Sequence, residues 1–108
     1  MNNSPIGIFD SGVGGLTVMR EVMEQLPYEN LIYFGDTARI PYGSRSEQTI
    51  KKYAYQCAQF LKSKNVKTIV IACNTASSIA LEHLQKSFDI PVIGVIDPGA
   101  TSAASATN

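Results

Sequence analysis

Four short apolar runs, separated by longer amphipathic segments, constrain the fold of this chain more than any other feature of its sequence. The runs cover residues 6–9, 31–34, 68–72 and 91–96 and are rich in β-branched and aromatic residues. Such runs are typical of strands, whereas the segments between them carry apolar residues at helical spacing. Strands that alternate with helices pair in parallel and are joined by right-handed crossovers. We therefore predict an α/β three-layer sandwich built around a parallel sheet.

The amphipathic segments also carry signals for where the helices begin and end. The first segment predicts a helix over residues 16–26, with Met23 and Leu26 on its buried face. Residues 44–47, Ser-Arg-Ser-Glu, fit a capping box in which Ser44 is the N-cap of the second helix. Asn65 suits the left-handed position that follows a helix C-terminus.

The second helix is expected to bury one apolar stripe, made of Ile50, Tyr53, Ala54, Cys57, Phe60 and Leu61. A third helix is expected from residue 74 to about Phe88, with Asn74 or Thr75 as its N-cap. Asp97 begins a further predicted helix, which Pro98 would open.

Composition and charge exclude several classes of protein. The 108 residues suffice for one small domain, and the formal net charge is zero, so nothing drives binding to nucleic acid or to an anionic membrane surface. No apolar run approaches the roughly 20 residues that a membrane-spanning helix needs. The N-terminus lacks the basic and apolar regions of a secretion signal. Two cysteines without such a signal favour the reducing cytoplasm.

Polar residues follow each predicted strand at its carboxyl end. In a parallel sheet of Rossmann-like or flavodoxin-like order, ligands bind beyond these ends. The residues that we expect along this edge are Asp10, Ser11, Asp36, Tyr42, Gly43, Cys73, Asn74, Thr75 and Asp97. The sequence therefore predicts one rim of polar and reactive side chains.

Cys73 is the most informative residue of this rim. A thiol at a helix N-terminus is close to the positive end of the helix dipole, which favours the thiolate, and a thiolate can take a proton from carbon. The alternative is a small cysteine that packs beneath the helix. Position alone leaves both interpretations open. Cys57, in contrast, lies on the apolar helical stripe and is predicted to be a core residue.

The other rim residues also have two interpretations. Asp10 can polarise an ammonium group or steer a proton, or it can cap the helix that follows. Its glycine-rich turn, residues 12–15, can bind an anion but lacks both the dinucleotide fingerprint and the P-loop pattern. Asp36 and Asp97 are expected to be structural, and Tyr42-Gly43 lies either in a functional loop or in a simple turn. No residues have metal-ligand spacing, so we predict no metal site.

Several linked motifs resemble those of the glutamate racemases, within the aspartate/glutamate racemase family. They are the stretches at residues 9–16, 41–43, 69–77 and 95–100, which occur in the family's order and at its usual separations. The resemblance covers nearly the whole chain. It implies an isomerase that interconverts L- and D-glutamate without a cofactor and supplies D-glutamate for peptidoglycan.

The resemblance also implies roles for particular residues. Cys73 matches one of two thiols that act on opposite faces of the substrate Cα. Asp10, from its position at the rim, is the other residue of this chain that we expect to be catalytic. The positions that match those holding the ammonium and carboxylate groups of the amino acid are Asp10, Ser11, Tyr42, Gly43, Asn74 and Thr75. The implied partner is therefore a small molecule, glutamate, with no nucleic acid and no membrane. A homodimer of the full-length protein stays open.

The chain departs from the family pattern in one respect. The second cysteine, in a Gly-Cys-Thr-His stretch of a second domain, and the C-terminal segment that returns to the first domain do not occur in it. We therefore expect residues 1–108 to be an incomplete first domain of a two-domain racemase, inactive by itself. The alternatives are an isomerase similar to aspartate racemase, a non-catalytic module that binds an anion or nucleotide, and a redox sensor based on Cys73.

Overall fold

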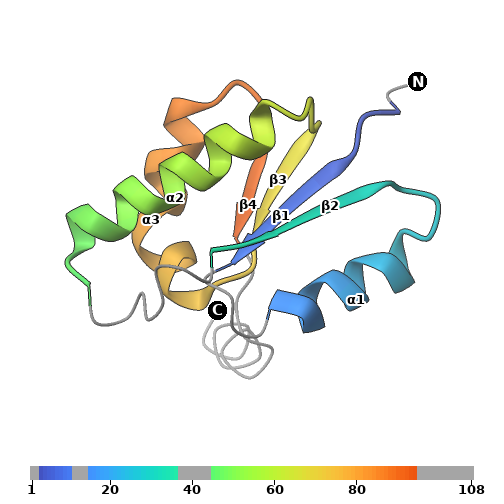
Figure 1. The fold of residues 1–108 in the computed structure, drawn as a ribbon, viewed down its shortest axis with the longest axis horizontal. Coiled ribbons are helices and arrows are strands. Elements are labelled where there is room, and N and C mark those ends of the chain that lie inside the picture. The colour runs from blue at the N-terminus through green and yellow to red at the C-terminus, as the bar shows by residue number, and fades with distance from the viewer. Residues whose placement is uncertain (1–2, 11–14, 37–44, 95–108) are drawn as a thin grey trace, which may run out of the picture.

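A parallel sheet covered by helices on both faces forms the computed structural model, which describes residues 3–10, 15–36 and 45–94 (Figure 1). The strands are β1 (Ile6–Asp10), β2 (Leu31–Gly35), β3 (Thr68–Ile71) and β4 (Val92–Gly94). The helices are α1 (Gly15–Gln25), α2 (Glu47–Lys62) and α3 (Asn74–Ser87). Among these residues the strand order is β2-β1-β3-β4, with every pair parallel. The predicted α/β sandwich with flavodoxin-like order is thus confirmed.

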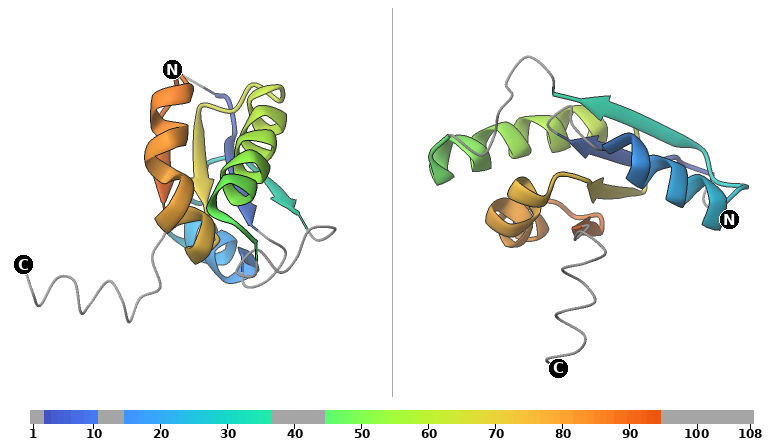
Figure 2. Two further views of the ribbon diagram at one scale, coloured as in Figure 1. Left: turned by 90° about the vertical axis from the view of Figure 1, so that its left-hand side faces the viewer. Right: turned by 90° about the horizontal axis from the view of Figure 1, so that it is seen from below.

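Two apolar clusters bind the helices to opposite faces of the sheet. Helices α2 and α3 pack side by side on one face, over Phe9, Ile69 and Ile71 (Figure 2). Helix α1 covers the other face, over Ile8 and Val70. Strand β3 lies between β1 and β4, and because side chains alternate along a strand its apolar residues contact both layers of helices.

Two of the predicted helix starts were wrong by one or two residues. The N-cap of α2 is Ser46, whose hydroxyl accepts a hydrogen bond from the Thr49 N–H at 3.2 Å, while Ser44 lies outside the described residues. The N-cap of α3 is Cys73, because the chain is still extended there (φ −93°, ψ 123°) and Asn74 is already helical. Asn65 adopts the predicted left-handed conformation, with φ 61°.

Three predicted core residues are largely exposed. Met23 and Leu26 are 52% and 47% exposed, because α1 contacts the sheet through the stripe that contains Val18 and Val22. Phe60 is 43% exposed and lies on the flank of α2, where its ring packs against that of Phe34 with 4.9 Å between the centroids. Periodicity predicted the helices but not the width of the stripe that each one buries.

The C-terminal predictions are tested only in part. Strand β4 covers Val92–Gly94 of the predicted 91–96, and residues 95–96 and the helix predicted from Asp97 lie outside the described residues. Within the described part of the chain, no helix has both the length and the hydropathy that a membrane span requires.

Substitution of Asn65 tests the turn that leads from α2 into β3. The Asn65 N–H donates to the Lys62 carbonyl at 3.0 Å while the residue holds its positive φ. A residue with a Cβ and no local hydrogen-bonding group is strained there, so Asn65→Ala should lower the free energy of unfolding by about 1 kcal/mol. Asn65→Gly should leave it unchanged or raise it, as measured by urea denaturation. Equal stability of the two variants would contradict this account.

Candidate active site at the carboxyl ends of the strands

Backbone pairing brings the ends of three strands to one edge of the sheet. Asp10 is opposite Gly35 in the pairing of β1 with β2, and the Asp36 N–H donates to the Asp10 carbonyl at 2.9 Å. On the other side of β1, the Ala72 N–H donates to the Phe9 carbonyl at 2.8 Å. Asp10, Asp36 and Cys73 therefore occupy neighbouring backbone positions along one rim of the sheet, as predicted.

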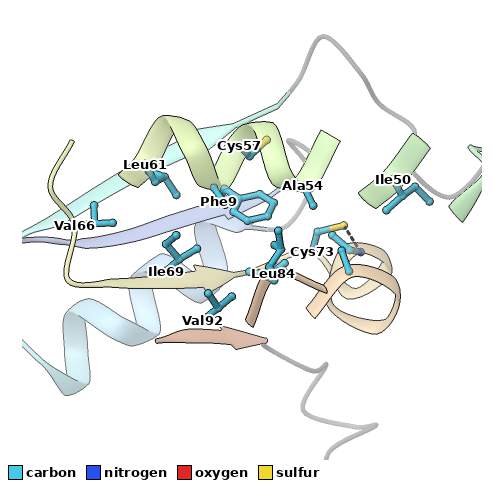
Figure 3. Packing of buried hydrophobic residues seen from close by; sticks show 14 residues of the cluster. Phe9, Ile50, Ala54, Cys57, Leu61, Val66, Ile69, Cys73, Leu84 and Val92 are labelled. Carbon is cyan, nitrogen blue, oxygen red and sulfur yellow. Dashed lines mark hydrogen bonds between the residues drawn. The ribbon is translucent and has the colours of Figure 1, made fainter. Parts of the chain in front are cut away.

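The side chains of the rim residues lie on different faces of the sheet. Asp10 continues the alternation of Ile6 and Ile8, so its carboxylate lies on the α1 face. Cys73 belongs to the cluster beneath α2 and α3 (Figure 3). The acid therefore lies on the α1 side of its strand, and the thiol packs with the residues beneath α2 and α3.

Cys73 both caps α3 and packs in the apolar cluster. Its sulfur accepts a hydrogen bond from the Ala76 N–H at 3.5 Å, shown dashed in Figure 3, and so caps α3 in the way an oxygen commonly does. The residue is buried at the end of the apolar cluster. The sulfur is therefore fixed at the positive end of a helix by a directed contact and by packing.

Asp10 is fully buried inside strand β1, not at the N-cap of α1. The Tyr33 hydroxyl donates to both carboxylate oxygens, at 2.9 Å each. Burial, this hydrogen bond and the charge of Asp10 raise the pKa of Tyr33 from 10.0 to about 12. The phenol is thus held protonated as a donor to the acid.

The Asp36 side chain has a partner in α2. Its buried carboxylate accepts a hydrogen bond from the Cys57 thiol, with 3.6 Å between sulfur and oxygen. This contact ties the end of β2 to α2, and the structural role expected for Asp36 stays a prediction. Cys57 is buried as predicted.

Sequence reasoning missed Tyr33, because the residue sits in an apolar run and was counted as part of a strand. The sequence does contain a signal for the Tyr33–Asp10 contact. Side chains that share a face of paired strands alternate with period two, and Tyr33 lies on the same face as Asp10. A hydroxyl on that face, next to a strand-end acid, indicates a hydrogen bond.

The remaining predicted site residues divide into two groups. Asn74 is exposed and Thr75 half-buried in the first turn of α3, beside Cys73. The others lie outside the described residues: Ser11, Tyr42, Gly43 and Asp97. No group of His, Cys, Asp and Glu that could hold a metal occurs within residues 3–10, 15–36 and 45–94.

One hollow of the described surface lies away from this rim. It has a volume of about 620 Å³, lies over α2 and α3, and is lined by residues such as Lys51, Tyr55 and His83. Strand topology and side-chain chemistry define the candidate site.

Comparison with known proteins identifies the family of the chain. Residues 6–108 match the family described as Asp/Glu/Hydantoin racemase. The chain belongs to this family. It is 58% identical, over 94% of its length, to the glutamate racemase of Geobacter metallireducens, and covers 38% of that relative.

Solved structures of racemases share the fold. The glutamate racemase from Thermus thermophilus, solved with beta-chloro-D-alanine, matches with a TM-score of 0.86 and 50% identity, over 94% of this chain and 40% of that one. The enzyme from Francisella tularensis, solved with D-glutamate, matches with a TM-score of 0.81 and 55% identity, over 87% and 36%. The chain spans about two fifths of the length of these relatives.

Because of the Tyr33–Asp10 contact, the free energy of unfolding should depend on pH in the alkaline range. A folded-state pKa of about 12 against 10.0 means that the folded chain holds the phenol proton more tightly than the unfolded chain. The resulting stabilisation is complete below about pH 10 and is lost as the pH rises to about 12.

Urea denaturation across this window measures the effect. The difference in free energy of unfolding between the wild type and Tyr33→Phe should shrink as the pH rises from about 10 to 12. Tyr28 is 98% exposed, and Tyr28→Phe is the matched control, for which the difference should stay constant. A constant difference for Tyr33→Phe would contradict the assigned contact.

Proposed function

We propose that this chain is the first part of a glutamate racemase, which interconverts L- and D-glutamate to supply D-glutamate for peptidoglycan. The observation that carries the proposal is the cysteine that caps α3 at the carboxyl end of β3, in a chain closely similar to proteins named glutamate racemases. The two free cysteines suit the reducing cytoplasm as its location.

In the proposed reaction, Cys73 is one of two acid/base groups. Its thiolate takes the Cα proton of one enantiomer, and a second thiol, outside these residues, gives a proton to the opposite face. One proton is lost and one gained, so the substrate is neither oxidised nor reduced and the two sulfurs exchange protonation states. The reverse direction uses the same groups in the opposite roles.

Substrate binding is proposed for the residues around this thiol. The free N–H groups in the first turn of α3, beside Asn74 and Thr75, suit a carboxylate. Asp10 supplies the negative charge that suits an ammonium group or guides a proton, and Ser11, Tyr42 and Gly43 complete the proposed set. The D-glutamate present in the Francisella tularensis structure supports this class of ligand.

Among related isomerases, glutamate is the substrate that we favour. The family includes racemases of several substrates, but the relatives with 55–58% identity are named glutamate racemases. An enzyme similar to aspartate racemase would have the same fold and the same strand-end cysteine. Racemisation assayed with glutamate and aspartate side by side separates these two possibilities.

Substitution of Cys73 tests the assignment in a protein of the relatives' full length that contains this chain. Cys73→Ser keeps a capping atom and Cys73→Ala removes it. Both should abolish racemisation, and both should abolish exchange with solvent deuterium for the enantiomer whose Cα proton Cys73 takes. Circular dichroism should show that Cys73→Ser stays folded. Deuterium incorporation from both enantiomers at the wild-type rate would rule out Cys73.

The 108-residue chain assayed by itself should show no turnover. Two-base racemisation needs a second thiol, and Cys57 is not available because it is 3% exposed and donates to Asp36. The measurement is the optical rotation of L-glutamate incubated with purified chain, with the full-length protein as the positive control. Turnover by the chain alone would contradict the two-thiol mechanism.

A further inference from the structure

We infer that Tyr33 and Gly35, on strand β2, position the Asp10 carboxylate for proton transfer. Neither residue is among those assigned above to substrate or to the reacting atoms. The inference rests on the proposed function, since it concerns the same site. It makes the two residues positioning residues that act through Asp10.

The hydrogen bond from Tyr33 restricts how the carboxylate can turn. Tyr33 is opposite Ile8 in the β1–β2 register, and its ring extends diagonally along the α1 face to Asp10, two residues further on. The hydroxyl is 2.9 Å from each carboxylate oxygen. A donor shared equally by both oxygens favours one orientation of the carboxylate plane.

Gly35 leaves the space in which this hydrogen bond forms. It is the residue directly opposite Asp10, and a Cβ built on it would lie 3.3 Å from the Tyr33 hydroxyl oxygen and 3.5 Å from Asp10 Oδ1. The backbone of Gly35 does not have a positive φ, so its conformation does not require glycine. The absence of a side chain therefore serves the contact and not the chain path.

The burial of Asp10 increases the importance of its hydrogen bond with Tyr33. Asp10 is 0% exposed, and an acid in such a medium depends on directed donors for its position. Tyr33 remains protonated throughout the neutral range, so the donor is present under any condition in which the enzyme would work. A small displacement of a group that takes part in proton transfer is costly, up to about 100-fold in rate.

The experiment measures the kinetics of Tyr33→Phe in a protein of the relatives' full length that contains this chain. The loss of the hydroxyl should lower kcat for glutamate about 10-fold or more and change KM by less than about 3-fold. In an Asp10→Asn background, Tyr33→Phe should cause no further loss, because the group through which it acts is gone. Tyr28→Phe, at an exposed position, is the control and should keep wild-type kinetics.

Gly35→Ala provides a second variant that keeps both functional groups. Its new Cβ crowds the Tyr33 hydroxyl at 3.3 Å, so kcat should fall in the same way, again only when Asp10 is present. If Tyr33→Phe does not fold, Gly35→Ala alone tests whether the Tyr33–Asp10 contact affects kcat. Thermal melts of each variant separate a loss of kcat from a loss of folded protein.

Three outcomes would overturn the inference. Wild-type kcat in both Tyr33→Phe and Gly35→Ala would show that the contact has no part in catalysis. Equal losses with and without Asp10 would show a structural role that does not act through the acid. A wild-type protein without racemase activity would overturn the proposed function and this inference together, whereas the first two results leave the proposed function standing.

Discussion

The pairing of β1 with a parallel strand on each side is the constraint on which the rest of this structure depends. Its last hydrogen bonds, from Asp36 to the Asp10 carbonyl and from Ala72 to the Phe9 carbonyl, end three strands at the same edge. The register then decides which side chains meet beyond that edge. A shift of one residue would exchange the faces of β1 and move Asp10 into the layer of α2 and α3.

Much of the fold was predictable because strand and helix periodicities are local properties of the sequence. The parallel pairing of the strands followed from the alternation of apolar runs with helical segments. Helix starts were less predictable, since Ser44 and Ser46 are both acceptable caps and a cysteine rarely takes that position. Exposure of Met23 could not be predicted, because it depends on how far α1 reaches across the sheet.

The candidate site was predictable in outline and not in its contacts. Topology placed Asp10, Asp36 and Cys73 together, because parallel strands end at one edge. The Tyr33–Asp10 and Cys57–Asp36 hydrogen bonds join residues 23 and 21 positions apart, and they depend on register and side-chain reach. The roles of all the predicted site residues stay predictions, and Ser11, Tyr42 and Gly43 lie outside the described residues.

The different contacts that hold Asp10 and Cys73 have an evolutionary consequence. The carboxylate is held from β2 by Tyr33, whereas the sulfur is held by the first turn of α3. Substitutions around one of these contacts change the surroundings of that group first, because the two contacts share no residue. A lineage can therefore alter the acid through β2 and the sulfur through α3.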